Sequence, residues 1–169
     1  LIFVPNYLEF VSLRNRLLKQ QEVTSGTTAS TYCDFVAVTE YSRISETSRG
    51  RARFIQGRKA ILLYTGRAHF FHRHFIKGAR HLIFFGLPEY ANFYSHHVNL
   101  LNDAGITTKH DKKNGNGGDD AAADDDTGIT LSCTVLFTKY ESHALERIVG
   151  TSNCKRMVGG EKSTFFFVS

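Results

Sequence analysis

The sequence lacks the long apolar runs of a membrane protein and the paired cysteines of a disulfide-rich one. Its longest apolar runs, at 60–64, 82–85 and 165–168, fall well short of the roughly 20 residues that span a bilayer. No basic start followed by a long apolar stretch marks a secretory signal. The three cysteines, at positions 33, 133 and 154, have no paired spacing, which argues against disulfides and a cysteine zinc site. These absences predict an intracellular protein with no membrane partner.

The sequence patterns of common catalytic sites are absent as well. There is no G-x-x-x-x-G-K-[ST] phosphate loop, no G-x-G-x-x-G, no G-x-S-x-G, no H-E-x-x-H and no C-x-x-C. Acidic residues are scarce in most of the chain, so no carboxylate pair suits acid–base chemistry. His69, His72 and His74 lie close together, but Arg73 and Lys77 would repel a cation, and zinc needs a fuller ligand set. We therefore expect no catalytic residue, metal, cofactor or small-molecule substrate.

Positive charge dominates the chain and is unevenly distributed. The formal net charge is +5, yet residues 103–126 hold seven acids and three bases, which leaves 18 bases and 9 acids elsewhere. Ten of the 21 bases lie between Arg43 and Arg80, against the single acid Glu46. Such clustering is typical of a nucleic-acid surface, although a crowded solvated face has the same composition. The phenylalanines and tyrosines are expected mainly in the core, and a few could stack on bases.

Apolar runs typical of buried parallel strands alternate with stretches of helical periodicity. The predicted strands are 1–4, 34–39, 60–64, 81–85, 131–137 and 164–168. The predicted helices are 7–21, 45–56, 68–76, 93–101, 139–149 and 151–158. Asn6 is expected to cap the first helix, Gly57 to end the second, and Ala52 and Ile55 to face inward from the second. This order predicts an α/β domain with a mostly parallel sheet and helices on both faces.

Residues 102–128 differ in kind from the rest of the chain. A run rich in asparagine and glycine is followed by clustered aspartates and alanines, which is the composition of a disordered acidic insertion. We expect the remainder of residues 1–169 to form one domain. The chain opens directly in an apolar strand without methionine, so we also expect it to be a fragment of a longer polypeptide.

The order of segments resembles the second RecA-like lobe of DEAD-box-like helicases. Residues 54–57 (Phe-Ile-Gln-Gly) precede a buried strand, and 62–65 (Leu-Leu-Tyr-Thr) match the strand that ends in an RNA-contacting threonine. Residues 81–88 match the strand pattern V-I-N-Y-D-L-P. The arginine-rich ATP motif expected next is replaced by Tyr-Ser-His-His-Val-Asn-Leu at 94–100. Because a transition-state arginine contributes about 10³–10⁵ in rate, the resemblance implies a three-layer RecA-like lobe without ATPase chemistry.

Several longer strings resemble the digestive organ expansion factor family, which is also the family of U3 small nucleolar RNA-associated protein 25. These strings are 2–11, 13–15, 40–42, 48–57, 62–65, 67–71, 76–78 and 133–140. Gly66 departs from the family pattern, which has a glutamate there. The resemblance implies a nuclear, nucleolar protein of the small-subunit processome. It would act in pre-ribosomal RNA maturation, with pre-ribosomal RNA, U3 small nucleolar RNA and other processome proteins as partners.

The sequence therefore predicts a scaffold that binds RNA and protein and is not an enzyme. Thr65 and Arg67 follow a buried parallel strand, where ligand sites commonly lie, although a plain turn residue and a surface arginine fit these positions equally. The residues predicted to contact RNA are Arg43, Arg49, Arg51, Arg53, Thr65, Arg67, Arg73, Lys77 and Arg80. Two alternatives stay open: the rear half of an active RNA helicase, and a protein-docking module whose basic stripe binds an acidic partner.

Overall fold

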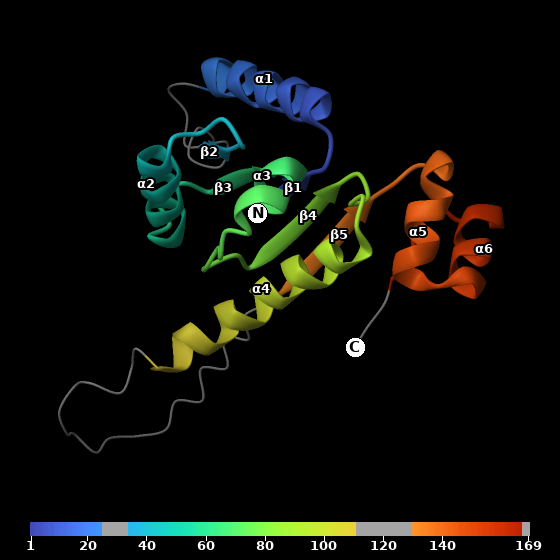
Figure 1. Ribbon diagram of the computed structural model, residues 1–169. Coiled ribbons are helices and arrows are strands. Elements are labelled where there is room, and N and C mark those ends of the chain that lie inside the picture. Colours follow the sequence, from blue (N-terminus) through green and yellow to red (C-terminus); the bar gives the residue numbers. More distant parts are fainter. Residues whose placement is uncertain (25–33, 111–129, 167–169) are drawn as a thin grey trace.

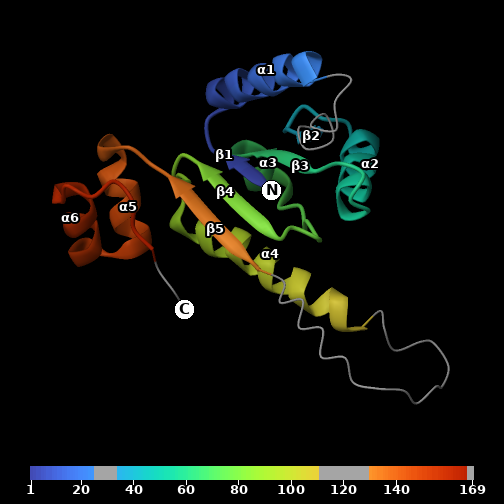
Figure 2. The same cartoon turned by 180° about the vertical axis from the view of Figure 1, so that it is seen from behind.

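Five parallel strands form the centre of the computed structural model, which describes residues 1–24, 34–110 and 130–166. They are β1 (Ile2–Val4), β2 (Phe35–Val38), β3 (Ile61–Thr65), β4 (His81–Phe85) and β5 (Ser132–Leu136). They pair side by side in the order β2-β3-β1-β4-β5 (Figures 1 and 2). Because all five run in one direction, their carboxyl ends share one edge of the sheet, and the loops that follow them gather there.

Helices cover both faces of this sheet. They are α1 (Tyr7–Thr24), α2 (Ile44–Ile55), α3 (Gly66–His72), α4 (Ala91–His110), α5 (Ser142–Val149) and α6 (Thr151–Gly159), with a short 3₁₀ helix, η2 (Lys139–Glu141). Figures 1 and 2 show α1 on one side of the sheet and α4 on the other, with α5 and α6 together beyond β5. The predicted α/β class, parallel sheet and two helical layers are confirmed. Within the described ranges, no helix is long and apolar enough to cross a membrane.

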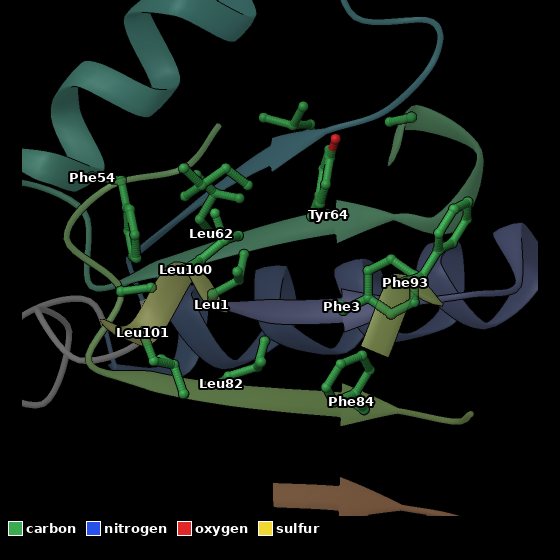
Figure 3. Close-up of a cluster of buried hydrophobic side chains, with 14 residues drawn as sticks. Leu1, Phe3, Phe54, Leu62, Tyr64, Leu82, Phe84, Phe93, Leu100 and Leu101 are labelled. Carbon is green, nitrogen blue, oxygen red and sulfur yellow. The ribbon is translucent and has the colours of Figure 1, made fainter. Parts of the chain in front are cut away.

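The main core lies between the sheet and the layer of α3 and α4 (Figure 3). Phe3 is fully buried on the central strand, and its ring meets those of Phe84 and Tyr64 at centroid distances of 5.4 and 6.5 Å. Phe93 and Leu101 close this core from α4. Burying such aromatic rings contributes about 1.5–3 kcal/mol each relative to exposure, so this face anchors the fold.

A second core lies under α1. Phe10 is buried against Val4 and Leu63, as the predicted apolar stripe of this helix requires. The helix begins where expected, because the Leu8 backbone N–H donates to Asn6 Oδ1 at 2.9 Å. The first helix of the chain is thus both capped and oriented by residues recognisable in the sequence.

Two predicted details of the helices are wrong. Ala52 and Ile55 of α2 are exposed, since the inner face is made by the small residues Thr47 and Gly50 together with Phe54. The third helix ends at His72 and not at position 76. Arg73 adopts a left-handed backbone with φ 42°, and the next backbone N–H donates to the Tyr64 hydroxyl at 3.1 Å, which turns the chain away from the helix.

The fourth helix and the last predicted strand also differ from the structure. The fourth helix runs to His110, into the range 102–128 predicted as an insertion, and residues 111–128 of that insertion lie outside the described residues. No strand forms over the described part of 164–168. Phe165 packs instead against the cluster of Leu87, Leu145 and Met157 that joins α5 and α6, so this segment is held by helices and not by the sheet.

Candidate nucleic-acid interface

Thr65 lies at the carboxyl end of β3 and organises the start of α3. Its hydroxyl accepts a hydrogen bond from the Ala68 backbone N–H at 3.2 Å, which caps the helix. The same hydroxyl donates to Glu40 Oε2 at 3.0 Å. Glu40 follows β2, so the two residues meet because β2 and β3 are neighbours. The Thr65 side chain is 1% exposed, and the geometry therefore favours a positioning role over direct contact with RNA.

Arg67 stands one residue beyond the helix start and reaches the surface. Its side chain is 62% exposed, and its Nε lies 3.7 Å from Glu40 Oε1. The guanidinium also lies 6.0 Å from the centre of the Phe71 ring. Glu40 thus links the cap residue to the exposed arginine. An exposed guanidinium at this edge can form two parallel hydrogen bonds with a phosphate.

Gly66, between these two residues, lies at a close backbone approach. A side chain at this position would place its Cβ 3.0 Å from the Pro5 carbonyl oxygen and 3.1 Å from the Pro5 Cα. Both neighbours are backbone atoms at the turn between β1 and α1, and they cannot rotate away as a flexible side chain would. The departure from the glutamate of the family pattern therefore coincides with tight contact between two chain segments.

The arginines of α2 form the second basic element. Arg43 is exposed immediately before the helix, and Arg49 and Arg53 are exposed along it. Arg51 is half-buried and its Nη1 lies 3.1 Å from His74 Nδ1. This contact joins α2 to the segment after α3, and positive charge from Arg51 helps burial to lower the pKa of His74.

The remaining predicted bases lie in the segment between α3 and β4. Arg73 and Lys77 are exposed, and Lys77 Nζ lies 5.6 Å from the Phe75 ring centre. A side chain at Gly78 would sit 3.5 Å from Ile55 Cα, so this segment runs against the end of α2. Arg80 is exposed just before β4, at the amino edge of the sheet. At about 3.3 Å per residue, the five-residue strands put it on the order of 15 Å from the Arg67 edge.

The nine predicted residues are thus not one cluster. Arg43, Thr65 and Arg67 belong to loops and helix starts at the carboxyl edge, whereas Arg80 belongs to the amino edge. Arg49, Arg51, Arg53, Arg73 and Lys77 connect the two along α2 and the segment against it. An RNA that touches all of the exposed ones would have to run across the molecule and not into a single pocket. Their contact with RNA stays a prediction.

Two histidines are core residues beneath this interface. His69 and His97 are 4% and 0% exposed, and their ring centres lie 4.2 Å apart. His97 Nδ1 lies 2.6 Å from the Phe93 carbonyl oxygen. Burial lowers the pKa of His69 to about 3 and that of His97 to about 4, so both rings are neutral near pH 7. In the described part of the chain, no three histidine, cysteine or acidic side chains gather as a metal site.

Sequence reasoning missed Glu40 and the exposed rings around Arg67. Phe70, Phe71 and Tyr90 are 50%, 59% and 44% exposed, although most large aromatics are buried. The signal was present in the sequence: positions 67, 70 and 71 share one helical face, whereas the buried pair 68 and 69 lies on the other. Glu40 carried no such signal, because its role depends on which strands are neighbours.

Among the solved structures similar to this chain is that of a DEAD-box protein. The structure of the Escherichia coli DEAD-box protein SrmB bound to regulator of ribonuclease activity A is 12% identical in sequence. The match covers 87% of this chain and 81% of that one, with a TM-score of 0.41.

Comparison with protein families and curated sequences is more specific. The family model of the Utp25 C-terminal domain matches residues 1–167. U3 small nucleolar RNA-associated protein 25 homologs of Rattus norvegicus and Homo sapiens are 37% and 35% identical over the whole chain, which spans 18% of each relative's length. The protein of that name in Phaeosphaeria nodorum is 34% identical over 99% of the chain and 20% of its own length. The chain therefore belongs to the Utp25 C-terminal domain family.

Proposed function

We propose that this chain is a helicase-like scaffold without catalytic activity that binds RNA and protein during pre-ribosomal RNA processing. The support is the family: relatives named for association with U3 small nucleolar RNA match the chain from end to end. Because these names refer to U3 small nucleolar RNA, they support the nucleolar location that we propose, and we extend the proposal to small-subunit assembly. Because the chain spans about a fifth of those relatives, the partners and activity of the whole protein are part of this proposal.

The absence of the sequence motifs that bind ATP in helicases supports a scaffold over an enzyme. No phosphate-binding loop occurs in the chain, and no arginine occurs between positions 89 and 101, after the Leu87-Pro88 pair. The first turns of α4 instead carry Phe93 and His97, which are buried in the core. Side chains packed in this way cannot reach a nucleotide phosphate without unfolding the helix. ATP hydrolysis by the full-length protein in the presence of RNA would overturn the non-catalytic part of the proposal.

One observation carries the RNA-binding part: the basic run between Arg43 and Arg80 is exposed and nearly free of acids. Its only acid is Glu46, and eight of its ten bases are exposed. Phosphate neutralisation by such side chains supplies most of the sequence-independent affinity for nucleic acid. The exposed bases are spread over α2, α3 and the segment before β4, so an RNA that contacts them would run across the molecule.

The test is charge reversal on α2 with a matched control elsewhere. Arg49→Glu with Arg53→Glu should weaken binding of the full chain to RNA and reduce the slope of log affinity against log salt by about one per lost contact. Lys155→Glu with Arg156→Glu, two exposed bases of α6, changes the net charge equally and should matter less. Equal effects of the two pairs would show that only total charge counts and would remove α2 from the interface.

Crosslinking in cells completes the test. Irradiation followed by mass spectrometry of the crosslinked peptides should place pre-ribosomal RNA within residues 43–80. Recovery of the protein with ribosome precursors but without such crosslinks would favour the alternative, a protein-docking module with a basic surface. In that case the same peptides should crosslink to a protein neighbour rich in acidic residues.

A further inference from the structure

The exposed face of α3 has a composition that phosphate binding alone does not explain. Arg67, Phe70 and Phe71 share this face, and Tyr90 lies beside it from the loop after β4. The Phe70 and Tyr90 rings stack at a centroid distance of 5.9 Å, with 26° between their planes. Phe71 meets Phe70 edge-on at 5.3 Å. We call these four residues the α3 aromatic surface.

We propose that the α3 aromatic surface binds unpaired RNA by stacking on its bases, while the neighbouring cations bind the phosphates. Base faces are available only where a strand is single, since a duplex buries them between its own neighbours. Exposed aromatic rings interleaved with positive charge are the arrangement with which proteins hold single strands without reading their sequence. This inference rests on the proposed function, because it names the form of RNA that the basic surface would bind.

Charge favours RNA over an apolar protein partner as the occupant. Residues 66–88 contain four bases and no acid. Two of these four bases lie over exposed rings: Arg67 over Phe71 at 6.0 Å and Lys77 over Phe75 at 5.6 Å. Phe75 is 49% exposed. An apolar partner would have to bury these cations without supplying a countercharge of its own, which is costly, whereas RNA supplies a phosphate for every base it stacks.

The fold holds the surface in place before any ligand arrives. On the opposite side of α3, Ala68 and His69 are buried against the α4 core. Thr65 caps the helix start, and Glu40 lies 3.7 Å from Arg67. Rings carried by a helix anchored at both its cap and its inner face lose little freedom on binding, and this preorganisation favours affinity. Glu89 is exposed next to Tyr90 and marks the end of the acid-free stretch 66–88.

The experiment compares single and paired RNA on ring variants of the full chain. A dye-labelled 12-nucleotide RNA of mixed sequence is titrated alone and annealed to its complement, at one salt concentration, with anisotropy as readout. We expect the single strand to bind more tightly. Phe71→Leu keeps apolar bulk but removes the stacking face, and should weaken single-strand binding about tenfold, whereas Phe71→Tyr should restore it. Tyr140→Leu, at an exposed ring on η2, is the matched control.

The outcomes separate this inference from the proposed function. Equal affinity for single and paired RNA, with no response to Phe71→Leu or Phe70→Leu, would overturn base stacking and leave phosphate binding standing. Absence of binding to either RNA by the unaltered chain would overturn the proposed RNA contact itself. Loss of a crosslinked protein neighbour on Phe71→Leu, with RNA affinity unchanged, would assign the surface to protein docking and also overturn the inference. Because the altered rings are exposed, circular dichroism should confirm that each variant is folded.

Discussion

The two basic regions of this chain, α2 and α3 with its following segment, carry similar charge on different foundations. The second helix borders the edge strand β2, its inner face is made by small residues and Phe54, and it carries the exposed bases Arg49 and Arg53. The third helix lies over the central strands, above a core of His69, His97 and Phe93. By their charge alone, the two regions would be equivalent. The difference in packing means that α3 holds exposed rings at fixed positions, whereas α2 offers exposed charge for the phosphate contacts that we propose.

The largest effect should come from removing the core beneath α3. Phe93 is 4% exposed and its ring centre lies 4.6 Å from that of His69. Phe93→Ala should lower the free energy of unfolding by about 3–5 kcal/mol, through lost burial and the cavity left behind. Urea unfolding followed by circular dichroism measures this. Phe71→Ala, one helix away but 59% exposed, should change stability by less than about 0.5 kcal/mol, and a comparable loss there would contradict the division between core and surface rings.

Acidification should destabilise the fold through the two histidines buried beneath α3. An unfolded histidine has a pKa of about 6.5, and burial lowers the pKa of His69 to about 3 and of His97 to about 4. Below pH 6.5 the unfolded chain therefore binds protons that the folded chain does not, and stability falls as the pH drops toward 4. Each histidine adds a slope of up to about 1.4 kcal/mol per pH unit.

The measurement is unfolding free energy at pH 7, 6 and 5 for the unaltered chain and for His69→Leu. Removing one buried histidine should reduce the slope of unfolding free energy against pH by up to about 1.4 kcal/mol per pH unit, which corresponds to one proton. The other titrating groups stay the same. Parallel slopes for the unaltered chain and His69→Leu would show that His69 titrates alike in the folded and unfolded states, and that its burial is not maintained in solution.

Much of this architecture could be predicted from the sequence, because burial on both faces leaves continuous apolar strands and periodic helices. The clustering of basic residues between Arg43 and Arg80 was equally evident in the sequence. It was harder to predict which face of each helix points inward and which side chains meet. The inner face of α2 escaped prediction because close packing there uses Gly50, which carries no apolar signal. The pairing of Glu40 with Thr65 could not be foreseen, since it depends on β2 and β3 being neighbours although their residues lie 25 positions apart.

The smallest effect concerns that inner face of α2. A methyl group at Gly50 would lie 2.5 Å from Val36 Cγ2, closer than two carbons can approach, so either the valine must change its rotamer or the helix must move off β2. Gly50→Ala should therefore destabilise the fold by about 1–3 kcal/mol, despite the better helix propensity of alanine. Gly159→Ala at the end of α6, where nothing lies within 4 Å, is the matched control and should be close to neutral. Adding Val36→Ala should recover part of the loss in Gly50→Ala if the clash is its cause. A neutral Gly50→Ala variant would mean that α2 is loosely held, and its arginines would then adapt to RNA by moving with the helix instead of presenting a fixed surface.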